Sequence, residues 1–346
     1  MHITLAKRSV FLSSQYKTLS IVISDSSDPY YNLALEQSIL ESLKKSEKCL
    51  LLYQNRKCVV MGRFQNPWLE CNIRSMKTNN IDLVRRQSGG GCVYHDLNNL
   101  NFCFLQSEKY HDKEQNNKII LNALSALEIN AYLSQRSDLL VNQDGPKKFS
   151  GSAFKQKKDR SFHHGTLLIN SDLKMLNHYL HTDQLNIESK STKSVRSSVI
   201  NLKSINESLD SDKLIESLRK SFGDFFDLEV KMKSINDISF NSEYFNEINK
   251  WQWIFGETPL FENSSEDDSY LINVKVKKAQ IIDIEILDKK NILPQLISLI
   301  SDSLNGLLVK EDLIEAKFNS LLADYNEYKK SIINIRDIIY SLFSFS

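Results

Sequence analysis

Apolar side chains recur at helical spacing in the first long segment of the chain. Asp28-Pro29 supplies an N-cap residue followed by a proline, which fits the first position of a helix. Apolar residues from Leu33 to Leu43 then form one face, so we expect a helix that runs to about residue 45. The same periodicity predicts further helices at 118–127, from 172 onward and at 212–226.

Short continuous apolar runs alternate with these helical segments. Such runs are typical of strands that are buried on both faces. They predict strands at 19–24, 49–53, 58–61, 82–86, 101–105 and 165–170. The segments 138–141 and 148–154 flank the turn residues Asp144-Gly145-Pro146 and suggest a hairpin. Residues 182–198 are rich in Ser and Lys without apolar periodicity, which indicates a loop.

The pattern changes after residue 230. Ser and Asn dominate 231–245, which we interpret as a linker. Beyond it, alternating residues predict a hairpin of 271–277 with 281–287, and helices follow at 293–304, 313–322 and 332–342. Mixed strands and helices followed by a small sheet with helices indicate an α+β (mixed α/β) protein of two domains, at 21–230 and 246–346.

Composition excludes several classes of protein. The chain has 346 residues, of which 41% are hydrophobic and 25% charged, as expected of a globular protein with ample core. The formal net charge of +1 argues against nucleic-acid binding through bulk charge, and no apolar run has the length of a membrane span. Five cysteines without C-x-x-C spacing favour neither disulfides nor a structural zinc site.

The first 24 residues contain no acidic side chain but include Lys7, Arg8 and Lys17 among Ser, Thr and apolar residues. This composition is typical of a mitochondrial transit segment, and a short disordered N-terminus is the alternative. We expect the segment to cover residues 1–20 and to direct the protein to the mitochondrial matrix.

Glycine is scarce, and six of the ten glycines lie between Gly89 and Gly165. The three consecutive glycines 89–91 let a ligand approach the main chain, and their N–H groups can face an anion. Arg85 and Arg86 precede them and carry positive charge suited to phosphate or carboxylate. The segment lacks the Lys-Ser/Thr of a Walker A loop and the spacing of a dinucleotide fingerprint. A flexible surface turn is the alternative.

Lys148 enters a strand of small residues, where a desolvated ammonium would polarise an acyl or phosphoryl oxygen. A solvated lysine at a hairpin is the alternative. His163 and His164 are adjacent on a strand and point to opposite faces, so they make a poor pair of metal ligands. We expect one to pack inward and one to face a site, and we expect no metal site. Spacing alone does not support a carboxylate pair between Asp138 and Asp172.

Six segments together resemble the lipoate–protein ligase A and lipoyltransferase family, part of the biotin/lipoate ligase superfamily. They occur in register as YNLALE at 31–36, GRFQNPW at 62–68 with ECN at 70–72, RRQSGGG at 85–91 through Asp96, KFSGSA at 148–153, HHGTLL at 163–168 and WQWIFGETP at 251–259. The resemblance implies a catalytic domain built on a mixed sheet, with a small α+β accessory domain at the C-terminus. It also implies lipoyl-AMP as the ligand.

By the same resemblance, Lys148 is the catalytic residue beside the acyl-phosphate linkage. The expected lipoyl-AMP contacts are Arg86, Ser88, Gly89, Gly90, Gly91, Tyr94, Arg136, Lys148, Thr166 and Ser197. Two departures from the family pattern stand out. Cys92 occupies a position that is often Ala or Thr, and Asn98 replaces a glycine, which puts any magnesium or nucleotide contact there in doubt.

The resemblance leaves three functions open. The first is a monomeric mitochondrial lipoyltransferase that moves a lipoyl group from lipoyl-AMP, or from a carrier such as glycine-cleavage H protein, to a lysine of the lipoyl domains of 2-oxoacid dehydrogenase E2 subunits. The second is a complete ligase, which would also need ATP and Mg²⁺. The third is a silent module that only binds lipoylated proteins.

Overall fold

The computed structural model describes residues 16–107, 113–135, 137–181, 186–195, 197–290 and 293–345. Most of the expected transit segment and Arg136 lie outside these residues, so both expectations stay predictions. No helix in the described part of the chain is both long and apolar enough to cross a membrane.

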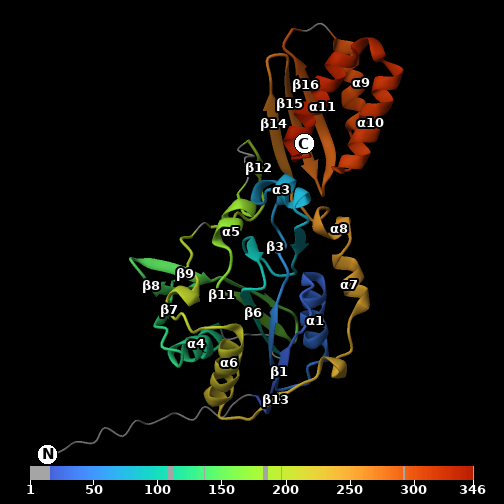
Figure 1. Cartoon of the computed structure of the whole chain (residues 1–346). Coiled ribbons are helices and arrows are strands. Elements are labelled where there is room, and N and C mark those ends of the chain that lie inside the picture. Colours follow the sequence, from blue (N-terminus) through green and yellow to red (C-terminus); the bar gives the residue numbers. More distant parts are fainter. Residues whose placement is uncertain are drawn as a thin grey trace, which may run out of the picture.

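A six-stranded mixed sheet forms the centre of the larger body (Figure 1). The β2, β1 and β13 strands run parallel, whereas β6, β11 and β10 continue the sheet in antiparallel fashion. In spatial order the strands are β10 (Ser152–Gln156), β11 (Ser161–Leu168), β6 (Asn99–Gln106), β2 (Glu47–Gln54), β1 (Thr18–Ile23) and β13 (Val230–Met232).

Helices cover both faces of this sheet, which explains why its central strands are continuously apolar. On β2, Leu50 and Leu52 join a core with α4 (Lys113–Ser125) and α6 (Ser211–Phe226). The alternate residues Cys49 and Leu51 pack in a second core that includes α1 (Pro29–Ser42). The α1 helix begins as expected, with the Asp28 carboxylate accepting hydrogen bonds from two backbone N–H groups.

Two three-stranded sheets lie beside the central sheet. The first has the order β4-β3-β5, and the second is an antiparallel sheet in the order β7-β8-β9. Their bounds are β3 (Cys58–Met61), β4 (Asp82–Arg85), β5 (Val93–His95), β7 (Ala131–Leu133), β8 (Leu139–Asn142) and β9 (Pro146–Ser150). The expected strand at 148–154 is wrong, because Gly151 divides it between β9 and β10, which belong to different sheets.

The C-terminal unit is a fourth sheet packed with helices, at one end of the molecule (Figure 1). Its strands are β14 (Phe261–Glu266), β15 (Tyr270–Lys277) and β16 (Gln280–Asp288), and its helices are α9 (Pro294–Leu304), α10 (Glu311–Asp324) and α11 (Lys329–Phe343). The predicted hairpin is confirmed, with Lys278 and Ala279 at positive φ in its turn. The expected loop at 182–198 contributes β12 (Glu188–Ser189) to the edge of this sheet.

The structure does not support the linker expected at 231–245. β13 pairs with β1, the Asn241 backbone N–H donates to Ser38 Oγ at 2.8 Å, and α7 (Ser242–Ile248) packs along α1. The short helix α8 (Trp251–Ile254) follows. The polar composition reflects the outer face of a segment whose apolar residues, such as Tyr244 and Ile248, are buried against the larger body.

Trp68 connects the two units. It belongs to α2 (Pro67–Glu70), yet its ring lies in the core of the C-terminal unit, with centroids 5.4 Å from Phe255 and Phe261 and 6.0 Å from Phe343. The side chain is 1% exposed. Two short helices complete this region, α3 (Ile73–Thr78) and α5 (Leu173–Tyr179).

Replacing Trp68 by Ala should lower the free energy of unfolding by about 3–5 kcal/mol, because it leaves a large cavity in the shared core. Phe64→Ala provides the matched control, since Phe64 is 59% exposed in the same segment and should change stability little. Denaturant titration measures both variants. Equal destabilisation of the two would contradict this role of Trp68.

Candidate functional site

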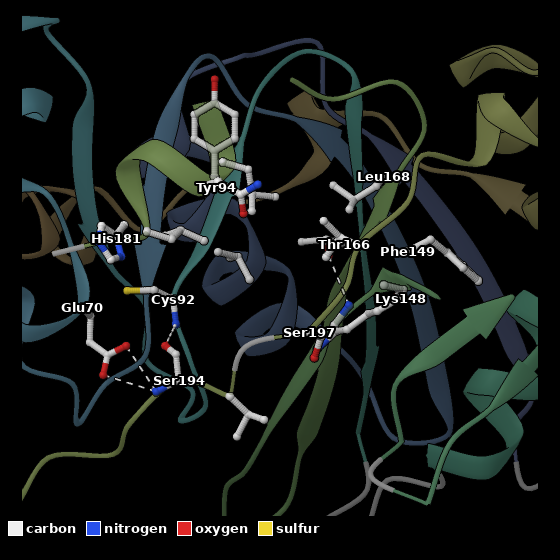
Figure 2. A pocket seen from close by; sticks show the side chains of 18 of the residues that line it. Glu70, Cys92, Tyr94, Lys148, Phe149, Thr166, Leu168, His181, Ser194 and Ser197 are labelled. Atoms are coloured by element: carbon white, nitrogen blue, oxygen red, sulfur yellow. Dashed lines mark hydrogen bonds between the residues drawn. The ribbon is translucent and has the colours of Figure 1, made fainter. Parts of the chain in front are cut away.

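Two adjoining cavities open where β5, β9 and β11 meet residues 193–195 and 197–199. Their volumes are about 510 Å³ and 360 Å³. Lys148 and Thr166 line both cavities, as do Gly151, Cys92 and Ser194. Figure 2 shows Lys148 and Thr166 across the larger cavity from Cys92, Ser194 and Glu70.

Arg86 holds the glycine loop in its conformation. Its Nη2 donates to the carbonyl oxygens of Gly89 at 2.7 Å and Gly91 at 2.9 Å, its Nε donates to Ser88 Oγ at 2.9 Å, and its Nη1 donates to the Val60 carbonyl at 3.0 Å. Burial lowers the pKa of Arg86 to about 10, so the guanidinium still carries its charge at neutral pH. Arg86 lines the smaller cavity, and these four bonds make it a support for the loop.

Arg85 points away from both cavities, which corrects the expectation that both arginines serve a bound anion. Its guanidinium donates to the carbonyls of Arg63 at 2.8 Å, Gln65 at 2.9 Å and Ile254 at 2.8 Å. Successive residues of a strand face opposite sides, so only one of the pair can reach the glycine loop. Arg85 instead ties β4 to the segment that leads into the C-terminal unit.

Glu36, His164 and Ser88 form a buried chain of hydrogen bonds behind the loop. His164 Nε2 lies 2.7 Å from Ser88 Oγ, and His164 Nδ1 lies 3.0 Å from Glu36 Oε2. Because Arg86 can only donate to Ser88, the hydroxyl proton of Ser88 is free to point at His164 Nε2, and Nδ1 then donates to Glu36. The Glu36 carboxylate also accepts from the Tyr53 hydroxyl at 2.9 Å. The chain links α1 and β11 to the loop.

The outcome for the histidine pair is close to expectation. Both rings are buried, but only His164 lines a cavity. Cys103 lies near enough to Glu36 and His164 that their potential ligand atoms fall within 4.8 Å of one another. The hydrogen bonds above already occupy the carboxylate and the imidazole, and burial raises the pKa of the Cys103 thiol well above its usual range. The cluster therefore serves the protein's own hydrogen bonding.

Lys148 lies at the junction of the two cavities. Its Nζ is 2.8 Å from Asp138 Oδ1, and both side chains are about one-quarter exposed. The backbone of Lys148 donates to the Ser198 carbonyl at 2.8 Å and accepts from the Ile200 N–H at 2.9 Å, which fixes the strand. A Cβ on Gly151 would lie 3.2 Å from Lys148 Nζ, so glycine leaves room for the ammonium. Asp172, the other carboxylate considered from sequence, caps α5 instead.

Ser194 closes the wall between the cavities. Its Oγ accepts from the Cys92 N–H at 3.0 Å and from Gln65 Nε2 at 3.0 Å, while its own N–H donates to the Glu70 carboxylate at 3.2 Å. Gly91 allows this approach, because a Cβ there would lie 3.0 Å from Ser194 Oγ. The segment thus rests directly on the glycine loop.

Most of the residues expected at the site lie around these cavities. Gly90 and Gly91 line the smaller cavity, and Tyr94 and Ser197 line the larger. Ser88 and Gly89 line neither and lie behind the loop surface, where they bond to Arg86. The Tyr94 ring is 1% exposed and stacks on Tyr179 with centroids 5.8 Å apart, so it forms a wall of the cavity.

Glu36, Glu70, Gln65 and Ser194 were missed as site residues. Glu36, Gln65 and Glu70 lie within conspicuous sequence segments, and their burial distinguishes them only once the fold is known. Ser194 belongs to a polar segment without periodicity, and no sequence signal separates it from its neighbours.

Gly62 offers a test of the loop's packing. A Cβ at this position would overlap the carbonyl oxygen of Gly90, which is backbone and cannot move aside alone. Gly62→Ala should therefore destabilise the protein by about 1–3 kcal/mol and speed amide hydrogen exchange at 88–92. Gly145→Ala is a control for a glycine far from the loop, where a Cβ meets nothing within 4 Å although its φ of +100° strains the turn. Unchanged exchange at 88–92 in Gly62→Ala would contradict the packing.

Comparison with known proteins agrees with this architecture. The chain matches the lipoyl protein ligase A/B catalytic domain family over residues 28–223. It is 36% identical over 331 residues to a curated lipoate–protein ligase A of Bdellovibrio bacteriovorus, and the alignment covers 92% of this chain and 97% of the relative.

Solved structures give the same result. P. falciparum LipL1 in complex with lipoate shares 28% identity at a TM-score of 0.61, covering 91% of this chain and 99% of that one. A bipartite lipoate protein ligase with its E2 lipoyl domain, from Thermoplasma acidophilum, shares the fold at 24% identity and a TM-score of 0.60, over 68% of this chain and 96% of that chain. The expected mixed fold is thereby confirmed. The chain belongs to the lipoate–protein ligase family, whose members are enzymes.

Proposed function

We propose that this enzyme transfers a lipoyl group from lipoyl-AMP to a lysine amine of a lipoyl domain. The observation that carries the proposal is the position of Lys148, paired with Asp138 at the junction of two cavities. An acyl-adenylate has an apolar tail and a polar nucleotide joined by an acyl-phosphate linkage, and the two cavities with a cation between them fit that shape.

The smaller cavity is the proposed site of the acyl tail. Val60, Val93 and Ala153 give it apolar walls, and Gly90 and Gly91 let the ligand lie against the main chain. The larger cavity, between Tyr94, Leu168 and Ser197, then receives the nucleotide. This assignment places the linkage beside Lys148 Nζ and the hydroxyl of Thr166, which line both cavities.

In the proposed reaction the neutral acceptor amine attacks the acyl carbon and an amide forms. The bond from that carbon to the phosphate oxygen breaks, so AMP leaves and the amine releases one proton. Negative charge grows on the carbonyl oxygen and on the leaving phosphate. A positioned ammonium stabilises both, because it is held in place before the reaction and needs no reorganisation. Asp138 holds the Lys148 ammonium in position.

Replacing Lys148 by Ala should lower the rate of transfer from lipoyl-AMP by about 10²–10³-fold, the effect of removing one preorganised donor. Lys147 is the control, because it precedes Lys148 on β9, donates to Ser198 Oγ and lines neither cavity. Lys147→Ala should retain normal turnover. Mass spectrometry of an apo lipoyl domain measures the product. Near-normal turnover in a folded Lys148→Ala variant would refute the role.

Glu36→Gln should raise the KM for lipoyl-AMP and lower kcat/KM by up to about 10²-fold while preserving the Tm. The substitution keeps a hydrogen-bond acceptor for His164 but removes the negative charge that faces His164 and Arg86 behind the loop. Glu41→Gln is the control on the same helix, because Glu41 is exposed. A variant with unchanged kcat/KM would show that the charge has no part in positioning the loop.

A complete ligase that also forms lipoyl-AMP from lipoate and ATP is the second candidate. It is favoured by the similarity to a curated lipoate–protein ligase A over 97% of that relative's length. The purified protein would be given an apo lipoyl domain with either lipoate, ATP and Mg²⁺ or synthetic lipoyl-AMP. Product from both mixtures indicates a ligase, and product from the adenylate alone indicates a transferase. Product from neither would overturn the proposal in favour of a silent binding module.

The acceptor class follows from the same proposal. We expect the acceptors to be lipoyl domains of 2-oxoacid dehydrogenase E2 subunits, and lipoylated glycine-cleavage H protein to be the alternative donor of the lipoyl group. The support is the Thermoplasma acidophilum ligase, a structural neighbour that was studied with its E2 lipoyl domain.

A further inference from the structure

We propose that Cys71 and Cys92 form a redox pair that closes reversibly to a disulfide in the wall of the site. Their sulfur atoms lie 3.6 Å apart. Cys71 follows α2 and is buried, whereas Cys92 lies just before β5 and lines both cavities. Of the five cysteines, all within the described residues, only Cys92 is not buried. The pair therefore has one accessible sulfur and one buried sulfur behind it.

Thiol–disulfide exchange with a low-molecular-weight disulfide closes the bond in two steps. The Cys92 thiolate attacks one sulfur of the small disulfide, forms a mixed disulfide and expels a thiolate. The Cys71 sulfur then attacks Cys92 Sγ and expels the second thiolate, and the two protons lost from the cysteines protonate the two leaving thiolates. Two protein thiols are oxidised, and one small disulfide is reduced to two thiols.

The surroundings of Cys71 suit the second step. Its pKa is raised above the usual range first by the hydrogen bond with the Cys92 thiol and then by burial, while the Arg85 guanidinium acts to lower it. Once Cys92 is held in a mixed disulfide, its thiol is gone and the first of these effects is lost. The buried cysteine is therefore most ready to react when its partner has already been modified.

Closing the bond also moves the site. The sulfurs must approach from 3.6 Å to about 2.05 Å. The N–H of Cys92 donates to Ser194 Oγ, and Gly91 immediately before Cys92 is held by Arg86. Displacement of Cys92 therefore shifts both the glycine loop and the segment that separates the cavities. We expect the oxidised enzyme to bind its acyl donor several-fold more weakly. This expectation rests on the proposed function.

The test uses the full-length reduced protein and oxidised glutathione as the probe. After incubation, free thiols are alkylated and the chain is digested and analysed by mass spectrometry without reduction. We expect a peptide pair joined through Cys71 and Cys92 that dithiothreitol separates. Recovery of both cysteines alkylated, or of Cys92 only as a glutathione adduct, would overturn the proposal.

Two variants distinguish the pair from general oxidation. Cys71→Ala should leave Cys92 as the glutathione adduct, because no second sulfur can displace it. Cys49→Ala is the control, since Cys49 is buried in β2, and it should retain the linkage. Loss of the linkage in a folded Cys49→Ala variant would contradict the assignment.

The consequence for the site is measured separately, as the KM for lipoyl-AMP before and after oxidation. An unchanged KM in the linked protein would overturn the switching role. If the reduced protein showed no transfer activity, the proposed function would be wrong. Mass spectrometry would still detect the peptide pair joined through Cys71 and Cys92, so the disulfide is tested independently.

Discussion

The buried guanidinium of Arg86 is the interaction on which the site depends. Three successive glycines have little conformational preference of their own, and ordering them costs more backbone entropy than ordering other residues. Arg86 offsets that cost by donating to two carbonyls of the loop and to Ser88 from a position shielded from water. Because these carbonyls are held from behind, the loop presents a defined surface to the smaller cavity.

The buried charge of Arg86 requires compensation, and the fold supplies it at a distance. The four hydrogen bonds of the Arg86 guanidinium go to one hydroxyl and three backbone carbonyls, not to a carboxylate. Glu36 lies beyond Ser88 and His164, and hydrogen bonds connect it to the loop. A buried polar network is stable when its members are satisfied. This requirement explains why α1, on the outer face of the sheet, carries polar residues that are as buried as its leucines.

Local signals in the sequence were sufficient for some elements and insufficient for others. The Asp28 cap, the turn at Asp144-Gly145 and the 271–287 hairpin could be predicted, because neighbouring residues determine them. The break at Gly151 could not be predicted. It depends on the pairing of β9 and β10 with strands of two different sheets, and neighbouring residues do not determine that pairing. β14 was missed because Phe261–Glu266 has one aromatic residue followed by polar ones, and its pairing with β15 decides its structure.

The site shows the same division. Lys148 and the glycine loop are conspicuous in sequence. The hydrogen bonds that connect Glu36, His164 and Ser88 join residues from distant segments and depend on strand register. The alternation of Arg85 and Arg86 follows from strand geometry, but which of the two faces the loop depends on how the small sheet packs.

The position of α2 has a mechanical consequence. Within its single turn, Trp68 is embedded in the C-terminal core and Glu70 holds Ser194. The segment that contains Ser194 is also attached to the C-terminal sheet through β12. Trp68 and β12 therefore both connect the C-terminal unit to the wall between the two cavities, so a rotation of that unit would displace this wall.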